Sequence, residues 1–275
     1  MIAFLAVLSI GAAAQPKEAT WKAYIQRGFS ALKQGQYARS EQLFRAAISE
    51  AGKLNQGDQH SVDLMIVSLN GLGEALRAQR KFPEAEQSCR KLVSLMELAR
   101  SEDDSEYALA LSNLGLVLSE QKKYEESEAV LQKALELRER YEGAQHPDVA
   151  ASLLNLGKLY QDQGNHAQAE TFYRRASTIL LNLPANQRTA DAFETLVICL
   201  NNLAAVYIER HDYDSAESVY KSSIDKVLVP QAPAAEQKKY LTNYAQLLEL
   251  MNRPTEARKL QERARLLNDS RPGKS

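Results

Sequence analysis

Six asparagines are the side chains in this 275-residue sequence with the clearest capacity for recognition chemistry. They recur at intervals of 41 to 47 residues, as Asn70, Asn113, Asn155, Asn201, Asn202 and Asn243, with Asn201 and Asn202 adjacent. An Asn amide both donates and accepts hydrogen bonds, so a row of them can pair with the backbone of an extended peptide. The alternative is that these amides bond neighbouring helix ends and hold them in register. Asn is a middling helix former and gains nothing locally by recurring, which favours the recognition role.

The motifs of common enzyme classes are missing from the sequence. It contains no G-x-G-x-x-G after a strand, no G-x-x-x-x-G-K-[ST], no H-E-x-x-H and no G-x-S-x-G. Its four histidines fall at turns and helix starts far apart in the chain, so we expect no metal site. His146 is interpreted as a capping or packing residue before Pro147, a residue suited to the first turn of a helix. We therefore predict no catalysis and no cofactor.

The asparagines belong to an internal repeat. The segments LNGLGEAL (69–76), LSNLGLVL (111–118), LLNLGKLY (153–160) and LNNLAAVY (200–207) share one pattern, and weaker copies surround Gly28 and Ala245. After each copy, an aromatic or its substitute is followed by small and bulky residues at helical intervals of three and four, as in Tyr124-Ser127-Leu131-Ala134. Short polar breaks separate the two halves. Each repeat therefore predicts a helix, a tight turn and an antiparallel helix, in which small residues such as Gly115 and Ser127 let the two backbones approach.

These residues resemble the tetratricopeptide repeat family, and the 42-residue spacing resembles the longer variant found in kinesin light chains. The stretch 143–176, with its lead-in His146-Pro147-Asp148-Val149, is the strongest match. The resemblance implies an all-α, right-handed superhelical solenoid of about six helix-turn-helix repeats, in one array over residues 15–268. The predicted repeats are 21–54, 66–99, 108–141, 150–183, 197–230 and 238–268.

In that family the first helix of each pair lines a concave groove, where ligands usually lie. The resemblance implies that the residue two places before the small Gly or Ala of each copy (Gly73, Gly115, Gly157, Ala204 and Ala245) points into the groove. The predicted peptide-binding residues are Asn113, Asn155, Asn202 and Asn243 at that position, Asn70 and Asn201 one residue earlier in their copies, and Lys158 and Gln246 nearby. No set of Lys, Asn and Arg matches the clamp that some members use for a terminal carboxylate. We expect a protein or peptide partner held in extended form. The alternatives are a structural component that self-associates, and the non-catalytic regulatory arm of a larger enzyme system.

Composition and the two ends complete these expectations. The formal net charge of −1 gives no pull toward nucleic acid. Residues 1–14 are apolar, too short to span a bilayer, and end in the small residues typical of a signal-peptidase site. They predict an exported, periplasmic or secreted protein. An apolar strip packed on the first helix, or an uncleaved anchor, is the alternative, and the protein would be cytoplasmic if the segment is not a signal. We expect no stable membrane span, a disordered tail at 269–275, and a monomer or weak homo-oligomer.

Overall fold

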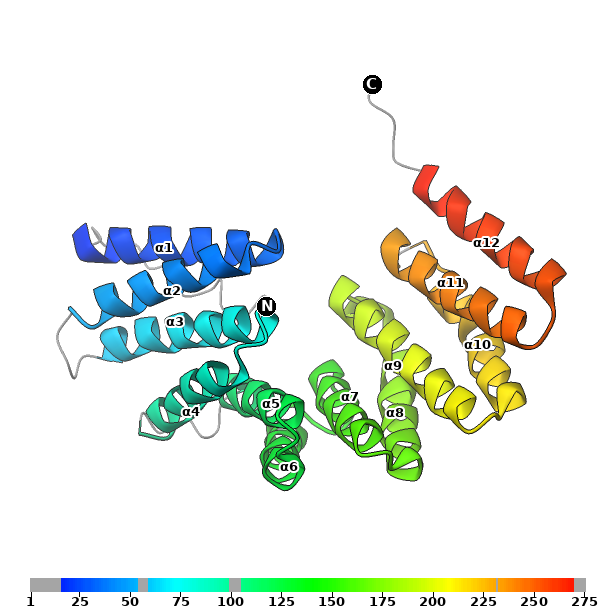
Figure 1. Ribbon diagram of the computed structural model, residues 1–275, viewed down its shortest axis with the longest axis horizontal. Helices are drawn as coiled ribbons and strands as arrows, with labels where there is room; N and C mark the ends of the chain where they lie inside the picture. Colours follow the sequence, from blue (N-terminus) through cyan, green and yellow to red (C-terminus); the bar gives the residue numbers. More distant parts are fainter. Residues whose placement is uncertain (1–15, 54–58, 99–104, 231, 270–275) are drawn as a thin grey trace. The chain divides into compact units, whose positions relative to one another are not determined.

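The computed structural model (Figure 1) describes residues 16–53, 59–98, 105–230 and 232–269. Over these residues it contains helices and no strand, which confirms the all-α prediction. The predicted signal segment lies outside the described residues. The helices are α1 (Pro16–Lys33), α2 (Tyr37–Ala51), α3 (Gln59–Ala78), α4 (Phe82–Leu98), α5 (Ser105–Glu120), α6 (Tyr124–Tyr141), α7 (Pro147–Asp162), α8 (His166–Leu181), the short 3-10 helix η2 (Ala185–Gln187), α9 (Ala190–Glu209), α10 (Tyr213–Val227), α11 (Ala234–Leu250) and α12 (Pro254–Asp269).

The helices pair along the chain as helix, tight turn, helix. The first helices begin earlier than the predicted ranges, most clearly α3 and α9, which start seven residues before 66 and 197. The start of α9 is set by the Thr189 side chain, whose oxygen accepts a hydrogen bond from the Ala192 N–H at 3.2 Å. The chain divides into two compact units, residues 1–137 and 138–275, within the single array predicted from the sequence. Each unit is described by itself.

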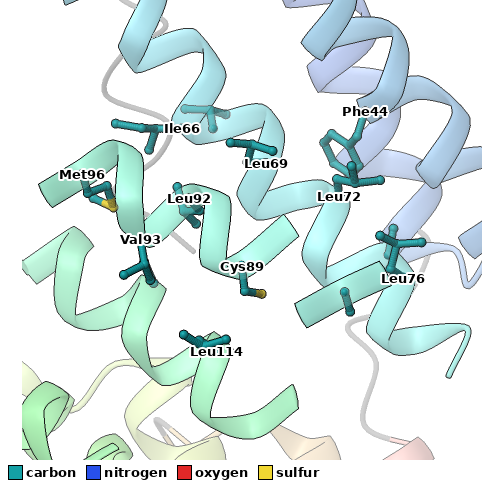
Figure 2. Packing of buried hydrophobic residues seen from close by; sticks show 14 of the residues in the cluster. Phe44, Ile66, Leu69, Leu72, Leu76, Cys89, Leu92, Val93, Met96 and Leu114 are labelled. Carbon is teal, nitrogen blue, oxygen red and sulfur yellow. The ribbon is translucent and has the colours of Figure 1, made fainter. Parts of the chain in front are cut away.

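In unit 1 the glycines allow close approach of neighbouring helices. Phe44 on α2 is fully buried, and its ring lies where a Cβ on Gly28 or Gly71 would be, at 2.9 and 2.3 Å. Hydroxyls fix the same crossings, because Ser127 Oγ donates to the Gly115 carbonyl at 2.7 Å and Ser40 Oγ donates to the Gly28 carbonyl at 2.9 Å. The predicted contact of Gly115 with Ser127 is thereby confirmed. Figure 2 shows Phe44 beside α3 and the apolar side chains that α3 and α4 bury together.

The turns between paired helices share one strained position. In every repeat one residue takes a left-handed backbone conformation, with φ between 59° and 75°; the six are Gly35, Arg80, Lys122, Gly164, His211 and Asn252. Only glycine adopts this conformation without a steric penalty. Three of the six turns therefore hold a long or ring-bearing side chain at a position that favours glycine.

Carboxylates tie each repeat to the next within both units. Glu41 accepts hydrogen bonds from Lys81 at 2.8 Å and from Gln79 at 2.9 Å, and Lys123 and Gln121 bind Glu86 in the same way. In unit 2 the equivalent carboxylates pair with arginines of the following turn, Glu170 with Arg210 and Glu217 with Arg253. Burial opposes ionisation of Glu41 and Glu86, but these hydrogen bonds outweigh it and lower each pKa to about 2.

Candidate functional site

In four of the repeats, one face of the first helix stays open to solvent. The small residue of the repeat pattern is Gly115 on α5, Gly157 on α7, Ala204 on α9 and Ala245 on α11. On each of these helices, the residues six and two places before it, and one and five places after it, are half-buried or exposed. We call these residues the open stripe: Leu109, Asn113, Leu116 and Glu120; Ala151, Asn155, Lys158 and Asp162; Ile198, Asn202, Ala205 and Glu209; Lys239, Asn243, Gln246 and Leu250. Their intervals of four, three and four residues place them on one side of a helix.

In unit 2 the stripes of three helices adjoin. Helix α9 packs against both α7 and α11, so we treat the stripes of these three neighbouring helices, which are labelled in Figure 1, as one surface. This surface mixes amides with half-buried aliphatic side chains such as Ile198 and Ala205, and ends at Leu250, whose side chain is 59% exposed.

The unit 2 asparagines differ in how their amides are used. Asn155 and Asn243 are half-buried, and neither side chain forms a hydrogen bond within the described residues. Asn202 lies near the Tyr173 hydroxyl, which donates to Gln161 Oε1 at 2.9 Å, and Asn201 accepts a hydrogen bond from the Tyr220 hydroxyl at 3.0 Å. The amides of Asn155 and Asn243 are therefore free to bind a ligand, and Asn201 helps to hold α9 against α10.

The other two predicted residues of unit 2 are charged or polar and lie at the surface. Lys158 is exposed and donates to Asp162 on the next turn at 3.0 Å. Gln246 is exposed and makes no side-chain hydrogen bond within the described residues. An exposed ion pair of this kind contributes little to stability, so Lys158 can exchange its partner at small cost.

In unit 1 the predicted asparagines bond to each other. Asn113 Nδ2 donates to Asn70 Oδ1 at 2.8 Å, and Asn70 Nδ2 donates to Glu74 Oε1 at 3.2 Å. Asn70 is only 6% exposed, so its main contact is the neighbouring helix, as in the alternative interpretation of the row. Gly71 occupies the asparagine position of this repeat because the Phe44 ring leaves no room for a larger residue.

Glu74 is a polar residue of this face that sequence reasoning missed. It is half-buried on α3, and burial raises its pKa above the ordinary value for a glutamate, although Arg77 and the Asn70 hydrogen bond act in the opposite direction. Its position, one residue after Gly73, corresponds to Leu116 and Lys158 in the next two repeats. That register was the signal that could have found it.

A group of possible cation ligands lies at the start of α7. Glu142, His146 and Asp148 bring three ligand atoms within 4.8 Å of one another. His146 caps the helix, as predicted, by accepting the Asp148 N–H at 3.2 Å ahead of Pro147. The buried Arg138 guanidinium, which donates to the Asp148 carbonyl at 2.8 Å, already supplies positive charge beside both carboxylates. The group therefore serves to join α6 to α7.

Two further features bear on chemistry. Both cysteines are buried and unpaired, and burial raises both thiol pKa values, that of Cys89 to about 12, so neither is an activated nucleophile. Helix α9 is long and apolar enough to cross a membrane by length and composition. This is weak evidence for a membrane span, because 56% of its apolar 18-residue stretch is buried. It packs against α7, α8, α10 and α11, as a core helix does.

Comparison with known proteins identifies the fold. A tetratricopeptide repeat model matches residues 63–126 and 106–182, and a second model of the same description matches 196–226. No curated protein matches significantly. Three similar structures are BtubC (BKLC) from P. vanneervenii (21% identity, 77% of this chain and 91% of that one, TM-score 0.61); a kinesin-light-chain-type protein of Podosopora anserina (15%, 73% and 91%, TM-score 0.58); and NprR with its cognate peptide NprX (14%, 92% and 68%, TM-score 0.57).

The family matches cover most of the repeats, and the similar structures share their helical solenoid fold. The assignment agrees with the small residues that recur in each repeat, with the paired helices and with the carboxylate ties between repeats. The chain belongs to the tetratricopeptide repeat family.

Proposed function

We propose that this protein is a non-catalytic interaction module that captures an extended segment of a partner protein on the open stripe of unit 2. The observation that carries the proposal is the pair of unbonded, half-buried amides of Asn155 and Asn243, on the two helices that flank α9. Both side chains are only partly buried, so their amides are accessible to a ligand. A ligand that supplies backbone N–H and C=O groups at both positions can form direct hydrogen bonds with them.

The surroundings of these amides favour an extended peptide with some apolar side chains. Ile198 and Ala205 lie half-buried on α9 between the two asparagines, where they offer contact area to alternate residues of such a ligand. Structural similarity to NprR, whose structure contains its cognate peptide NprX, supports the same kind of ligand. Lys158 and Gln246 border the amides and can select among polar residues.

The proposal is tested with a random dodecapeptide display library and the purified chain, comparing wild type with Asn155→Ala/Asn243→Ala. The matched control is Asn182→Ala/Asn186→Ala, which removes two exposed asparagines away from the open stripe. We expect peptides selected on wild type to lose about tenfold or more in affinity on the first variant, roughly 1.4 kcal/mol, and to keep it on the control. Equal binding to all three proteins would refute this site.

A further inference from the structure

Glu74 is a partly exposed carboxylate on an otherwise buried stretch of helix α3 in unit 1. Between Ile66 and Leu76, it is the one residue of α3 that is not buried. The same helix packs against α1, α2, α4 and α5, so little of it is open to a ligand. What a ligand can reach in the middle of α3 is this carboxylate.

The carboxylate lacks a direct cationic partner among the described residues. Its one hydrogen bond comes from the neutral amide of Asn70, at 3.2 Å. Arg77, one turn further along α3, pairs with Glu120 on α5 instead, at 3.1 Å. Charges that leave water are normally paired, and Glu41 and Glu86 in the same unit each bind a lysine. Glu74 differs from these two carboxylates because its hydrogen bond comes from a neutral amide.

The amides beside Glu74 point the same way. Asn113 donates to Asn70, which donates to Glu74, so both bonds run toward the carboxylate. These two hydrogen bonds leave the Asn113 oxygen free to accept, since it receives no hydrogen bond within the described residues. The equivalent positions on the adjacent helices α1 and α5 are Phe29 and Leu116, both half-buried. The two helices that adjoin α3 therefore carry apolar side chains at the register of Glu74.

We propose that unit 1 binds a lysine or arginine side chain of the partner protein, with Glu74 as its counter-ion and the Asn113 oxygen as a second acceptor. Phe29 and Leu116 contact the aliphatic stem of that side chain, because such stems pack on apolar surface while the charged end is bound. This inference rests on the proposed function, the capture of segments of a partner protein, and it names the chemistry that unit 1 selects in such a segment.

The expected effect of Glu74 on the stability of the fold also supports this assignment. A carboxylate whose pKa is raised on folding lowers stability at neutral pH, so its removal should not harm the fold. A residue that lowers stability fits a binding role better than a structural one.

The test uses the same peptide library with wild type, Glu74→Gln and a matched control, Glu84→Gln. Glu84 is an exposed carboxylate on α4 that pairs with Arg45 at 2.8 Å. We expect wild type to enrich Lys or Arg at one peptide position. Replacing that residue by Gln should weaken binding to wild type and to Glu84→Gln about tenfold or more, and leave binding to Glu74→Gln unchanged. Glu74→Gln should melt at the wild-type temperature or above.

The outcomes separate the two proposals. If peptides that need Asn155 and Asn243 are selected but no selected peptide shows a basic preference, or if Glu74→Gln retains that preference, the assignment of Glu74 is wrong and the proposed function stands. If no peptide is selected by wild type, both are wrong. A Glu74→Gln protein that melts well below wild type also overturns the inference, because Glu74 would then be a structural residue.

Discussion

Gly71→Ala is the substitution that best probes the packing of unit 1. A Cβ at this position would lie 2.3 Å from the Cε1 and Cζ atoms of Phe44, whereas carbon atoms in ordinary contact are about 3.5–4.0 Å apart. The ring must therefore move by more than about 1 Å, and Phe44 is fully buried among its neighbours. Overpacking of this kind costs about 1–3 kcal/mol or more.

A matched control lies two residues away on the same helix. A Cβ on Gly73 would approach only the Cys89 sulfur, at 3.1 Å, and replacement of a helical Gly by Ala contributes about 1 kcal/mol of stability. We therefore expect Gly71→Ala to lower the free energy of unfolding by about 1–3 kcal/mol, and Gly73→Ala to change it little or to raise it.

The assay is urea denaturation followed by the fluorescence of Trp21. This residue is the sole tryptophan of the chain, is 1% exposed, and donates from Nε1 to Ser68 Oγ on α3 at 2.9 Å. Its emission therefore reports on the packing of α1 against α3. Phe44→Leu should recover part of the loss in the Gly71→Ala background. Equal stability of the two alanine variants would show that Phe44 does not pack on Gly71 as described.

Three further predictions concern the turns, the ties between repeats and the thiols. Lys122→Gly should raise the free energy of unfolding by about 0.5–1 kcal/mol in urea denaturation, because glycine relieves the left-handed backbone at φ 62°; a lower value would contradict the turn geometry. Since the pKa values of Glu41 and Glu86 are lowered to about 2 on folding, the stabilisation that these carboxylates give is present above about pH 4.5 and is lost as the pH falls toward 2. In denaturation between pH 5 and 2, the free energy of unfolding should therefore fall less steeply for Glu41→Gln/Glu86→Gln than for wild type. Cys89 and Cys199 should not react with a thiol reagent at pH 8 until the protein unfolds, and fast native labelling would mean that their helices open.

The fold could be predicted from the sequence because its signals are local and repeated. A small residue in the first helix and a bulky one in the second, as with Gly157 and Tyr173, already state which faces meet. Helix starts were less predictable, because the cap at Thr189 lies outside the repeated pattern.

The candidate site could be predicted only in part, because its residues share a register but differ in partners. Asn70 and Asn155 look alike in the sequence, yet one is buried against Asn113 and the other has a free amide. The cause is the neighbouring helix α2, because its Phe44 ring leaves room only for glycine at position 71. The asparagine of this repeat therefore lies at position 70. Glu74 escaped notice because a single acidic residue on a helix ordinarily indicates a solvated face.

Selective ¹⁵N labelling of asparagine side-chain amides tests the central claim most directly. A peptide selected on wild type is titrated into the labelled protein, with signals assigned by single Asn-to-Ala substitutions. Binding on the open stripe predicts that the side-chain NH₂ signals of Asn155 and Asn243 shift on saturation, while those of the exposed Asn182 and Asn186 do not. Saturable binding that leaves the Asn155 and Asn243 signals unmoved would contradict the account.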